Sequence, residues 1–268
     1  MISNAKKKAD GADRPETTAD AFLGGRIEVV QNKAGHRAGS DAVFLAAAVP
    51  ARSGESVLDA GAGAGTAGLC VLARVPETHV TAVEIDETQC ALAKTNAVRN
   101  GFEARFRAIA ADLTAPSKVL SEAGLIREGY GHVMANPPFY AEGSVRVAPD
   151  ASRAAAHVMP QGELERWVRF LATMTAPKGT LTLIHRAGEQ GNVLEALKDR
   201  FGDLAIFPLF PKPGTAAGRI IVRGRKNSRA GLRVLPGLVL HEAGGAYTKE
   251  AEAILRGGAA LSLDAPRD

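Results

Sequence analysis

An asparagine, two prolines and an aromatic residue, Asn136 to Phe139, directly follow an apolar run that ends at Ala135. The run predicts a buried strand, and ligands of open α/β sheets bind just beyond the carboxyl ends of the strands. The Asn136 side-chain oxygen and the Pro137 carbonyl can both accept hydrogen bonds from an NH2 group. The prolines present no N–H donor to that group, and Phe139 offers a face on which a planar base or amide can stack. The motif predicts a site for a flat NH2-bearing substrate, although a simple turn would also use these residues.

A glycine-rich turn follows an earlier apolar segment, residues 56–59, and precedes a segment with helical spacing of apolar residues. Glycines allow close backbone approach to a ligand, and such a turn delivers the ligand to a helix N-terminus. A second predicted strand, residues 79–83, ends at Glu84, where an acidic side chain can accept hydrogen bonds from ribose hydroxyls. We interpret this region as a nucleotide-binding site. Its glycines are Gly61, Gly63 and Gly65.

Two chemistries share this arrangement. Residues 63–68 form a literal G-x-G-x-x-G, which is typical of dinucleotide-binding domains. However, Asp59 closes the strand before the glycines and gives Asp-x-Gly-x-Gly-x-Gly, which resembles the pattern of S-adenosylmethionine (SAM) enzymes. An enzyme that methylates an amine needs the hydrogen-bond acceptors of the motif at Asn136, whereas a dehydrogenase has no evident need for them. We favour methyl transfer and keep a noncatalytic nucleotide- or NAD-binding module as an alternative.

Together these segments resemble the class I SAM-dependent methyltransferases that act on exocyclic or amide nitrogens. The order and spacing of that class are found in Asp59 to Gly65, Glu84, Asp112 with Leu113, and Asn136 to Phe139. Within the class, the chain resembles the bacterial tRNA(Val) adenine-N6 methyltransferase family. Residues 24–26 and 36–41 resemble the N-terminal motif of that family, and residues 246–248 resemble its C-terminal tail. The likeness covers about residues 20–258 of the chain.

The resemblance implies an α/β fold, a Rossmann-like, seven-stranded, doubly wound sheet, with SAM as the methyl donor. It also implies roles for individual residues. The turn from Asp59 to Gly65 would contact the methionine part of SAM, with help from Ser40 and Asp41; Glu84 would bind the ribose; and Asp112 with the Leu113 backbone would bind the adenine. Asn136 would border SAM and, with the Pro137 carbonyl, hold the target amine, while Phe139 stacks on the base. Two acceptors on the amine hydrogens would align the nitrogen lone pair with the methyl group, so that no strong general base is needed.

Strands and helices that alternate along the chain predict parallel pairing. We expect helices at residues 87–100 (with Leu92 and Val98 inward), 162–176 and 193–201; strands at 105–109, 133–135, 180–184, 204–209 and 219–223, with a turn at 177–179; and an appended strand and helix in 232–258. The domain prediction is a disordered tail (1–19), a methyltransferase domain (20–226) and a C-terminal extension packed on the same domain (227–268).

Basic residues are concentrated near the C-terminus. The formal net charge is only +4, with a pI of about 9.2, but the segment from Pro211 to Arg233 holds seven Lys and Arg residues and no Asp or Glu. Such a segment attracts phosphates, and residues 224–229 are predicted to form a loop that can reach an RNA backbone. The alternative is a solvated sheet edge protected by charge against aggregation. The candidate RNA contacts are Lys212, Arg225, Lys226 and Arg229.

Other functions are disfavoured by composition. Cys70 and Cys90 are too few for a disulfide framework or a zinc site, and are expected to pack as small apolar residues on helices. The six histidines are scattered, so no metal is predicted. No apolar run has the length of a membrane span and no signal-peptide core is present, so we expect a cytoplasmic protein.

The predicted function is SAM-dependent methylation of adenine N6 in RNA, with tRNA as the expected partner. Guanine-N2 methylation of rRNA and methylation of a protein glutamine amide remain alternatives.

Overall fold

The computed structural model describes residues 16–34, 37–138 and 162–264. Its strands are β1 (Thr17–Phe22), β2 (Ile27–Asn32), β3 (Ser56–Ala60), β4 (His79–Glu84), β5 (Phe106–Ala110), β6 (Tyr130–Ala135), β7 (Thr175–Arg186), β8 (Phe201–Phe210), β9 (Arg219–Lys226), β10 (Arg233–Val234) and β11 (Leu238–Val239). Its α-helices are α1 (Ser40–Ala48), α2 (Thr66–Arg74), α3 (Glu87–Arg99), α4 (Ser117–Glu122), α6 (Glu163–Met174), α7 (Gln190–Leu197) and α8 (Lys249–Leu255), and the short 3-10 helices are η1 (Leu23–Gly25) and η2 (Ala187–Glu189).

The main sheet has the strand order β10-β8-β9-β7-β6-β3-β4-β5, with β11 beside β8. Neighbouring strands are parallel except at β9, which lies between β7 and β8 and is antiparallel to both. The seven strands from β5 to β8 correspond to the sheet that the sequence predicts, and the Rossmann-like fold class is confirmed. β3 lies inside this sheet between β6 and β4, and its residues 57–60 are all buried, which suits a strand covered on both faces.

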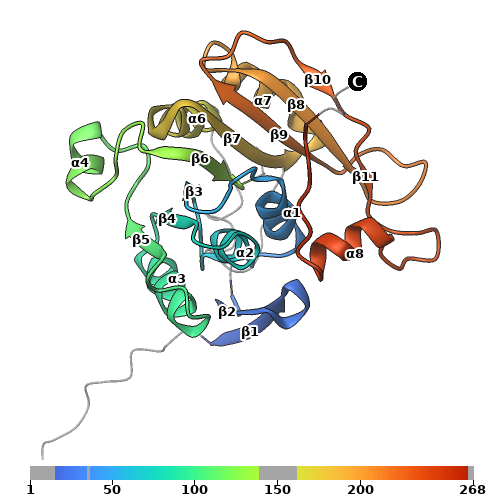
Figure 1. Cartoon of the computed structure of the whole chain (residues 1–268), viewed down its shortest axis with the longest axis horizontal. Helices are drawn as coiled ribbons and strands as arrows, with labels where there is room; N and C mark the ends of the chain where they lie inside the picture. The colour runs from blue at the N-terminus through green and yellow to red at the C-terminus, as the bar shows by residue number, and fades with distance from the viewer. Residues whose placement is uncertain (1–15, 35–36, 139–161, 265–268) are drawn as a thin grey trace, which may run out of the picture.

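Helices cover both faces of the sheet. α1, α2 and α3 pack on one face, where Phe44, Leu69 and Ala93 belong to one apolar core. α4, α6 and α7 pack on the other face, where Leu120, Val168 and Val193 belong to a second core. Figure 1 shows α6 and α7 on one side of the sheet and α1 and α2 on the other. This arrangement is doubly wound, and ligands of such sheets bind at the carboxyl ends of the strands.

The N-terminal part of the described chain differs from the prediction of a tail that ends at residue 19. Residues 17–19 belong to β1, which pairs with β2 in an antiparallel hairpin. The burial of β1 alternates, and its sequence contains few large apolar residues, so its apolar content gives no strand signal. The hairpin is attached to α3 through Asn96, which donates to the Val30 carbonyl at 2.9 Å and accepts from the Val30 N–H at 2.8 Å.

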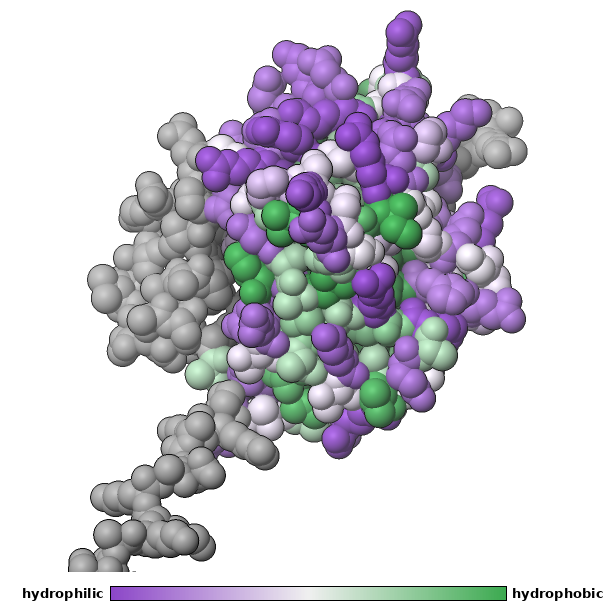
Figure 2. All heavy atoms as spheres, turned by 90° about the vertical axis from the view of Figure 1, so that its left-hand side faces the viewer, coloured by the Kyte–Doolittle hydropathy of each residue, from purple (hydrophilic) through white to green (hydrophobic). Residues whose placement is uncertain are grey.

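Helix α3 shows a second difference. It begins and ends as predicted, because the Asp86 side chain accepts from the Thr88 and Gln89 N–H groups and Gly101 follows with a φ of +70°. Leu92 packs partly against the core, but Val98 is 63% exposed and the prediction that it faces inward is wrong. Buried Ala97 and Asn96 occupy the inner face instead. Figure 2 shows the side of the molecule that includes α3 and α4, where apolar surface lies scattered among polar residues.

Three boundaries near β7, β8 and β9 also differ. The predicted turn at 177–179 is an irregularity within β7: its pairing with β6 shifts from Tyr130 with Thr175 to His132 with Thr180. The predicted loop at 224–229 begins later, because β9 pairs with β7 as far as Arg225 and with β8 as far as Lys226. Phe201 begins β8, and α7 ends at Leu197. In each case strand pairing overrides a local turn or helix signal.

The C-terminal extension packs on the same sheet. β10 and β11 pair with β8, and α8 packs against α1 through buried Ala251 and Ile254. The Thr248 hydroxyl caps α8 by accepting from the Ala251 N–H at 3.2 Å. Within the described ranges, no helix is long and apolar enough to cross a membrane. Cys70 and Cys90 are free, buried and helical, as predicted.

Candidate active site

Four segments with predicted site residues meet at the carboxyl edge of the sheet. Ala60 of β3 is level with Val83 of β4 and with Ala135 of β6, and Glu84 is level with Ala110 of β5. Because these strands are parallel, the residues that follow them emerge side by side. The edge therefore brings together the glycine loop, Glu84, the segment at Asp112 and the Asn136 motif.

The glycine loop requires its glycines for conformation and for packing. Gly61, Gly63 and Gly65 have φ values of +67°, +54° and +86°, a region that side chains disfavour. A Cβ on Gly61 would also collide with the Trp167 ring of α6, whereas a Cβ on Gly63 would meet no atom of the described residues within 4 Å. The Trp167 ring therefore packs against the loop at Gly61, whereas the space beside Gly63 is open. The last glycine, Gly65, leads into the N-terminus of α2. This is a cradle that can accept a ligand close to the backbone.

Asp59 lies beneath this loop. Its carboxylate is 2% exposed and accepts the Gly68 N–H of α2 at 3.0 Å. Burial raises the pKa of Asp59 to about 7; the hydrogen bond from Gly68 opposes that shift, and the negative charge of Glu84 adds to it. Asp59 therefore joins the end of β3 to the first turn of α2, which fixes the shape of the loop.

Glu84 joins the loop to the end of β4. One carboxylate oxygen accepts the Gly63 N–H at 2.8 Å, and the other accepts the Asp86 N–H at 3.0 Å. Each carboxylate oxygen has further acceptor capacity. Glu84 is only partly buried, so this capacity can receive the hydroxyls of a ribose lying across Gly63.

Asn136 carries the clearest sign of a ligand site. Its side-chain oxygen is buried and has no hydrogen-bond partner in the described part of the chain. A buried acceptor without a partner costs about 1–3 kcal/mol, so such groups often mark a functional position. Pro137, which follows it, is also buried. Phe139 lies outside the described residues, so its predicted stacking role stays a prediction.

The remaining cofactor candidates lie at the same edge. Asp112 is exposed, and one of its oxygens accepts from both the N–H and the hydroxyl of Thr114 at 2.8 Å, while Leu113 is buried. Ser40 is exposed at the first residue of α1. Asp41 accepts from Arg219 Nε at 2.8 Å. This ion pair attaches the start of α1 to the start of β9, a link between segments 178 residues apart that sequence reasoning missed.

The four candidate RNA contacts do not lie together. Lys212 follows β8 at the carboxyl edge and is exposed. Arg225 pairs with Thr180 in the first half of β7, so β9 carries it toward the amino edge, and Lys226 and Arg229 follow it there. The two edges are about 20 Å apart, since β9 rises about 3.3 Å per residue. The structure therefore separates Lys212 from the other three.

Lys226 differs from the surface cation that the sequence suggests. Its side chain is 13% exposed, and its ammonium group donates to Glu128 at 2.8 Å and to the carbonyls of Ala172 and Thr175 at 2.8 and 2.7 Å. These carbonyls belong to the C-terminal turn of α6, where a cation is favourable. Arg225 and Arg229 remain exposed. Lys226 thus holds α6 against the sheet.

The fold and this site define a class I methyltransferase. The methyltransferase small domain family model matches residues 35–201, and the chain belongs to this family. S-adenosylmethionine is the methyl donor of such enzymes, and the open cradle at Gly63, the partly buried Glu84 and the buried Asn136 oxygen fit it.

Individual relatives give the comparison more detail. A Bacteroides fragilis protein named tRNA1(Val) (adenine(37)-N6)-methyltransferase is 25% identical over 202 residues, which are 74% of this chain and 80% of that protein. A Klebsiella pneumoniae protein of the same name is 32% identical over 46% of this chain and 49% of its own length. A crystal structure described as a predicted O-methyltransferase from Agrobacterium tumefaciens has a TM-score of 0.70 and 32% identity, and covers 82% of this chain and 98% of that one.

Proposed function

We propose that this protein transfers a methyl group from S-adenosylmethionine to N6 of an adenine in tRNA. The observation that carries the proposal is the buried Asn136 oxygen without a partner among the described residues, at the end of β6 and beside the glycine loop. An exocyclic amine supplies the donor that this acceptor lacks. The curated relatives named for adenine-N6 methylation of tRNA support the choice of base and of RNA.

On the cofactor side, the chain offers a rigid cradle. Asp59 and Glu84 fix the loop through Gly68 and Gly63, at 3.0 and 2.8 Å. The backbone at Gly63 is open to a ligand, and Glu84 has capacity to bind ribose hydroxyls. Ser40, Asp41, Asp112 and the Leu113 backbone are proposed to complete this side. SAM supplies an electrophilic methyl group when it is bound.

On the substrate side, Asn136 and the Pro137 carbonyl orient the amine. Both accept its hydrogens, which favours a pyramidal nitrogen whose lone pair points at the methyl group. The aryl amine is a poor nucleophile because its lone pair is delocalised into the ring, so positioning supplies most of the acceleration. The proton becomes acidic only after transfer and can leave to solvent. A base in a folded tRNA must be splayed out of its stack to reach the buried Asn136 oxygen. Splaying costs least where the base is already unpaired, as in a loop.

The RNA side of the proposal rests on Lys212, which lies at the same edge as Asn136, and on the exposed Arg225 and Arg229 at the opposite edge. A folded tRNA is long enough to contact both edges. We also propose a cytoplasmic location, because the proposed substrate is a tRNA, as the names of the curated relatives suggest.

The test is mass spectrometry of nucleosides from tRNA and rRNA incubated with the protein and SAM that carries a labelled methyl group. We expect label in N6-methyladenosine from tRNA, and about 10²- to 10³-fold slower labelling with Asn136→Ala. Label in N2-methylguanosine from rRNA, or in a 2′-O-methylated nucleoside, would show that the protein methylates a different group and would contradict the proposed substrate. Label only in a release factor would indicate a glutamine methylase. Binding of NADH but not of SAM would contradict methyl transfer altogether.

A further inference from the structure

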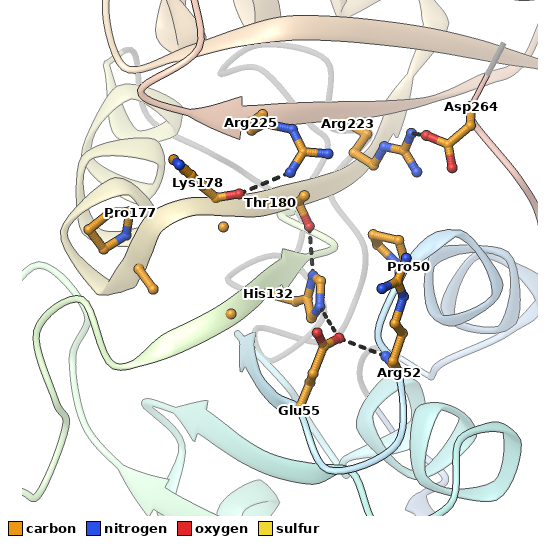
Figure 3. A pocket seen from close by; sticks show the side chains of 13 residues that line it. Pro50, Arg52, Glu55, His132, Pro177, Lys178, Thr180, Arg223, Arg225 and Asp264 are labelled. Atoms are coloured by element: carbon orange, nitrogen blue, oxygen red, sulfur yellow. Dashed lines mark hydrogen bonds and ion pairs between the residues drawn. The ribbon is translucent and has the colours of Figure 1, made fainter. Parts of the chain in front are cut away.

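The amino edge of the sheet carries a separate pocket of about 390 Å³. It lies between the chain that follows α1, the starts of β6 and β7, and the second half of β9. Arg223 and Arg225 come from β9 on one side of it, and Arg52 and Glu55 come from the opposite side, with His132 and Thr180 between them (Figure 3). No residue of the candidate active site lines this pocket in the described part of the chain.

Positive charge dominates its lining. Four cations, Arg52, Lys178, Arg223 and Arg225, face two carboxylates, those of Glu55 and Asp264. The side chains of Arg52 and Lys178 are exposed and make no hydrogen bond or ion pair with any described residue. An anion that enters the pocket therefore displaces no hydrogen bond or ion pair of these two side chains within the described ranges; Arg52 has only a longer-range electrostatic interaction with Glu55.

Both carboxylates already have partners. Glu55 accepts from His132 Nε2 at 2.8 Å and from the Arg52 N–H at 2.7 Å, and Asp264 pairs with Arg223. Since a carboxylate can only accept, His132 Nε2 carries the proton, and its Nδ1 accepts from the Thr180 hydroxyl at 2.8 Å. Burial, assisted by Arg225 and Arg223, lowers the pKa of His132 despite Glu55. The ring is neutral, so the positive field of the pocket comes from its Arg and Lys residues.

Arg223 is the deepest cation. Its side chain is only 7% exposed, and Asp264, its partner, is 70% exposed. A guanidinium has five N–H donors in a planar fork, which matches the oxygens of a phosphate. Arg225 donates one of its N–H groups to the Lys178 carbonyl at 3.0 Å, which directs its head group over the pocket (Figure 3).

The wall at Lys178 is held in an unusual conformation. Between its two registers with β6, β7 has four residues, 176–179, opposite Gly131 alone, and Lys178 has a φ of +65°, which non-glycine residues rarely adopt. A Cβ on Gly179 would approach the Gly131 carbonyl oxygen to 2.7 Å, so the neighbouring position requires glycine. Strained backbone of this kind persists where the surrounding structure enforces it, often at ligand sites.

We propose that this pocket binds a phosphate group, with Arg52, Lys178, Arg223 and Arg225 as its cationic ligands. The phosphate belongs either to the backbone of bound RNA or to a free phosphate compound, since both present the same oxygens. The site is distinct from the methyl-transfer site and lies about 20 Å from it, across the length of β9.

The test uses inorganic phosphate as the probe, added at constant ionic strength to the full chain and followed by amide chemical shifts. We expect saturable shifts at the amides that line the pocket, Gly131, Gly179 and Thr180. The double variant Arg52→Gln/Lys178→Gln, which breaks no side-chain hydrogen bond of the described residues, should bind phosphate about tenfold more weakly or worse. The matched control is Lys118→Gln/Lys198→Gln, which removes the same charge from exposed positions on α4 and just after α7.

A second measurement distinguishes the two sources of phosphate. If the phosphate belongs to RNA, the double variant should make the slope of log affinity for tRNA against log salt less steep by roughly 0.7 to 0.9 for each RNA phosphate that it no longer neutralises, while the control keeps the slope. An unchanged slope with weakened phosphate binding assigns the pocket to a free phosphate compound. Shifts that do not saturate, or equal phosphate binding by the double variant and the control, would overturn the proposal. Phosphate binding is measured without methyl transfer. A negative result would therefore overturn the phosphate site and leave the proposed methyltransferase activity untouched.

Discussion

Lys226 offers a sharp test, because the sequence assigns it to RNA and the structure assigns it to folding. Replacing Lys226 with Met keeps most of the apolar stem and removes the ammonium. The carbonyls of Ala172 and Thr175 then lose donors at 2.8 and 2.7 Å. Each buried acceptor left without a partner costs about 1–3 kcal/mol, and loss of a cation at a helix C-terminus adds about 0.3–1 kcal/mol.

We therefore expect Lys226→Met to lower the free energy of unfolding by about 3 kcal/mol. For a chain of this size, the melting temperature should fall by roughly 6–12 °C. Urea unfolding followed by circular dichroism measures the first quantity, and calorimetry the second. Glu128→Gln should cost less than Lys226→Met, because the Glu128 side chain is 44% exposed and the two carbonyls keep their donor.

Lys212→Met is the matched control, since it removes the same charge from an exposed side chain in the turn that follows β8. We expect its stability to stay within about 0.5 kcal/mol of the parent. The reasoning is refuted if Lys226→Met is as stable as Lys212→Met. It is also refuted if Lys226→Met keeps its stability but lowers the salt dependence of tRNA binding by the amount expected for one phosphate, since the ammonium would then be free to reach RNA.

Three further predictions concern the carboxyl edge. Asn136→Ala should reduce kcat about 10²- to 10³-fold with little change in the Kd for SAM, measured by single-turnover kinetics and calorimetry, and an active variant would remove the proposed amine site. Glu84→Gln should weaken SAM about 10- to 100-fold through loss of charge-assisted bonds, and an unchanged Kd would exclude the ribose role. Asp59→Asn should remove a pH dependence: because the folded pKa of Asp59 is raised to about 7 from 3.8, its contribution favours folding at low pH and is lost as pH rises to 7. The parent's stability relative to this variant should fall by up to about 1.4 kcal/mol per pH unit between pH 4 and 7; a constant difference across that range would contradict the burial argument.

The parts of the site that the sequence predicts are those that local chemistry encodes. A buried strand followed by glycines with positive φ leaves a pattern within ten residues, and so does Asn136 after an apolar run. Once the strands are known to be parallel, their ends must share an edge, so the meeting of Gly63, Glu84 and Asn136 follows from topology. These predictions need no knowledge of distant contacts.

The errors have the opposite origin. Helical spacing places Val98 inward, but the inner face of this turn of α3 is occupied by buried Asn96 and Ala97, and Asn96 is bonded to Val30 of β2, a contact that the local sequence does not indicate. Residues 224–229 carry Gly, Asn and Ser, which favour a loop, yet β7 and β8 flank β9 as far as Lys226 and supply the hydrogen bonds that keep it extended. The burial of Lys226 depends on Glu128, which lies 98 residues away in the sequence. Nothing local to either residue indicates that they meet.

The antiparallel direction of β9 explains why one basic segment has several roles. A strand that runs against its neighbours begins at the carboxyl edge and ends at the amino edge. Arg219 at its start therefore pairs with Asp41 beside the candidate active site, while Arg223 and Arg225 near its end line a pocket on the far side. Lys226, one residue further, is used inside the protein. Charge density along this sequence segment thus cannot identify an RNA-binding surface by itself, because alternation and strand direction distribute the charges over two edges and the interior. Variants that neutralise several of these residues together would combine losses of folding and of binding, which is why the experiments above change the exposed Arg52 and Lys178 separately from Lys226.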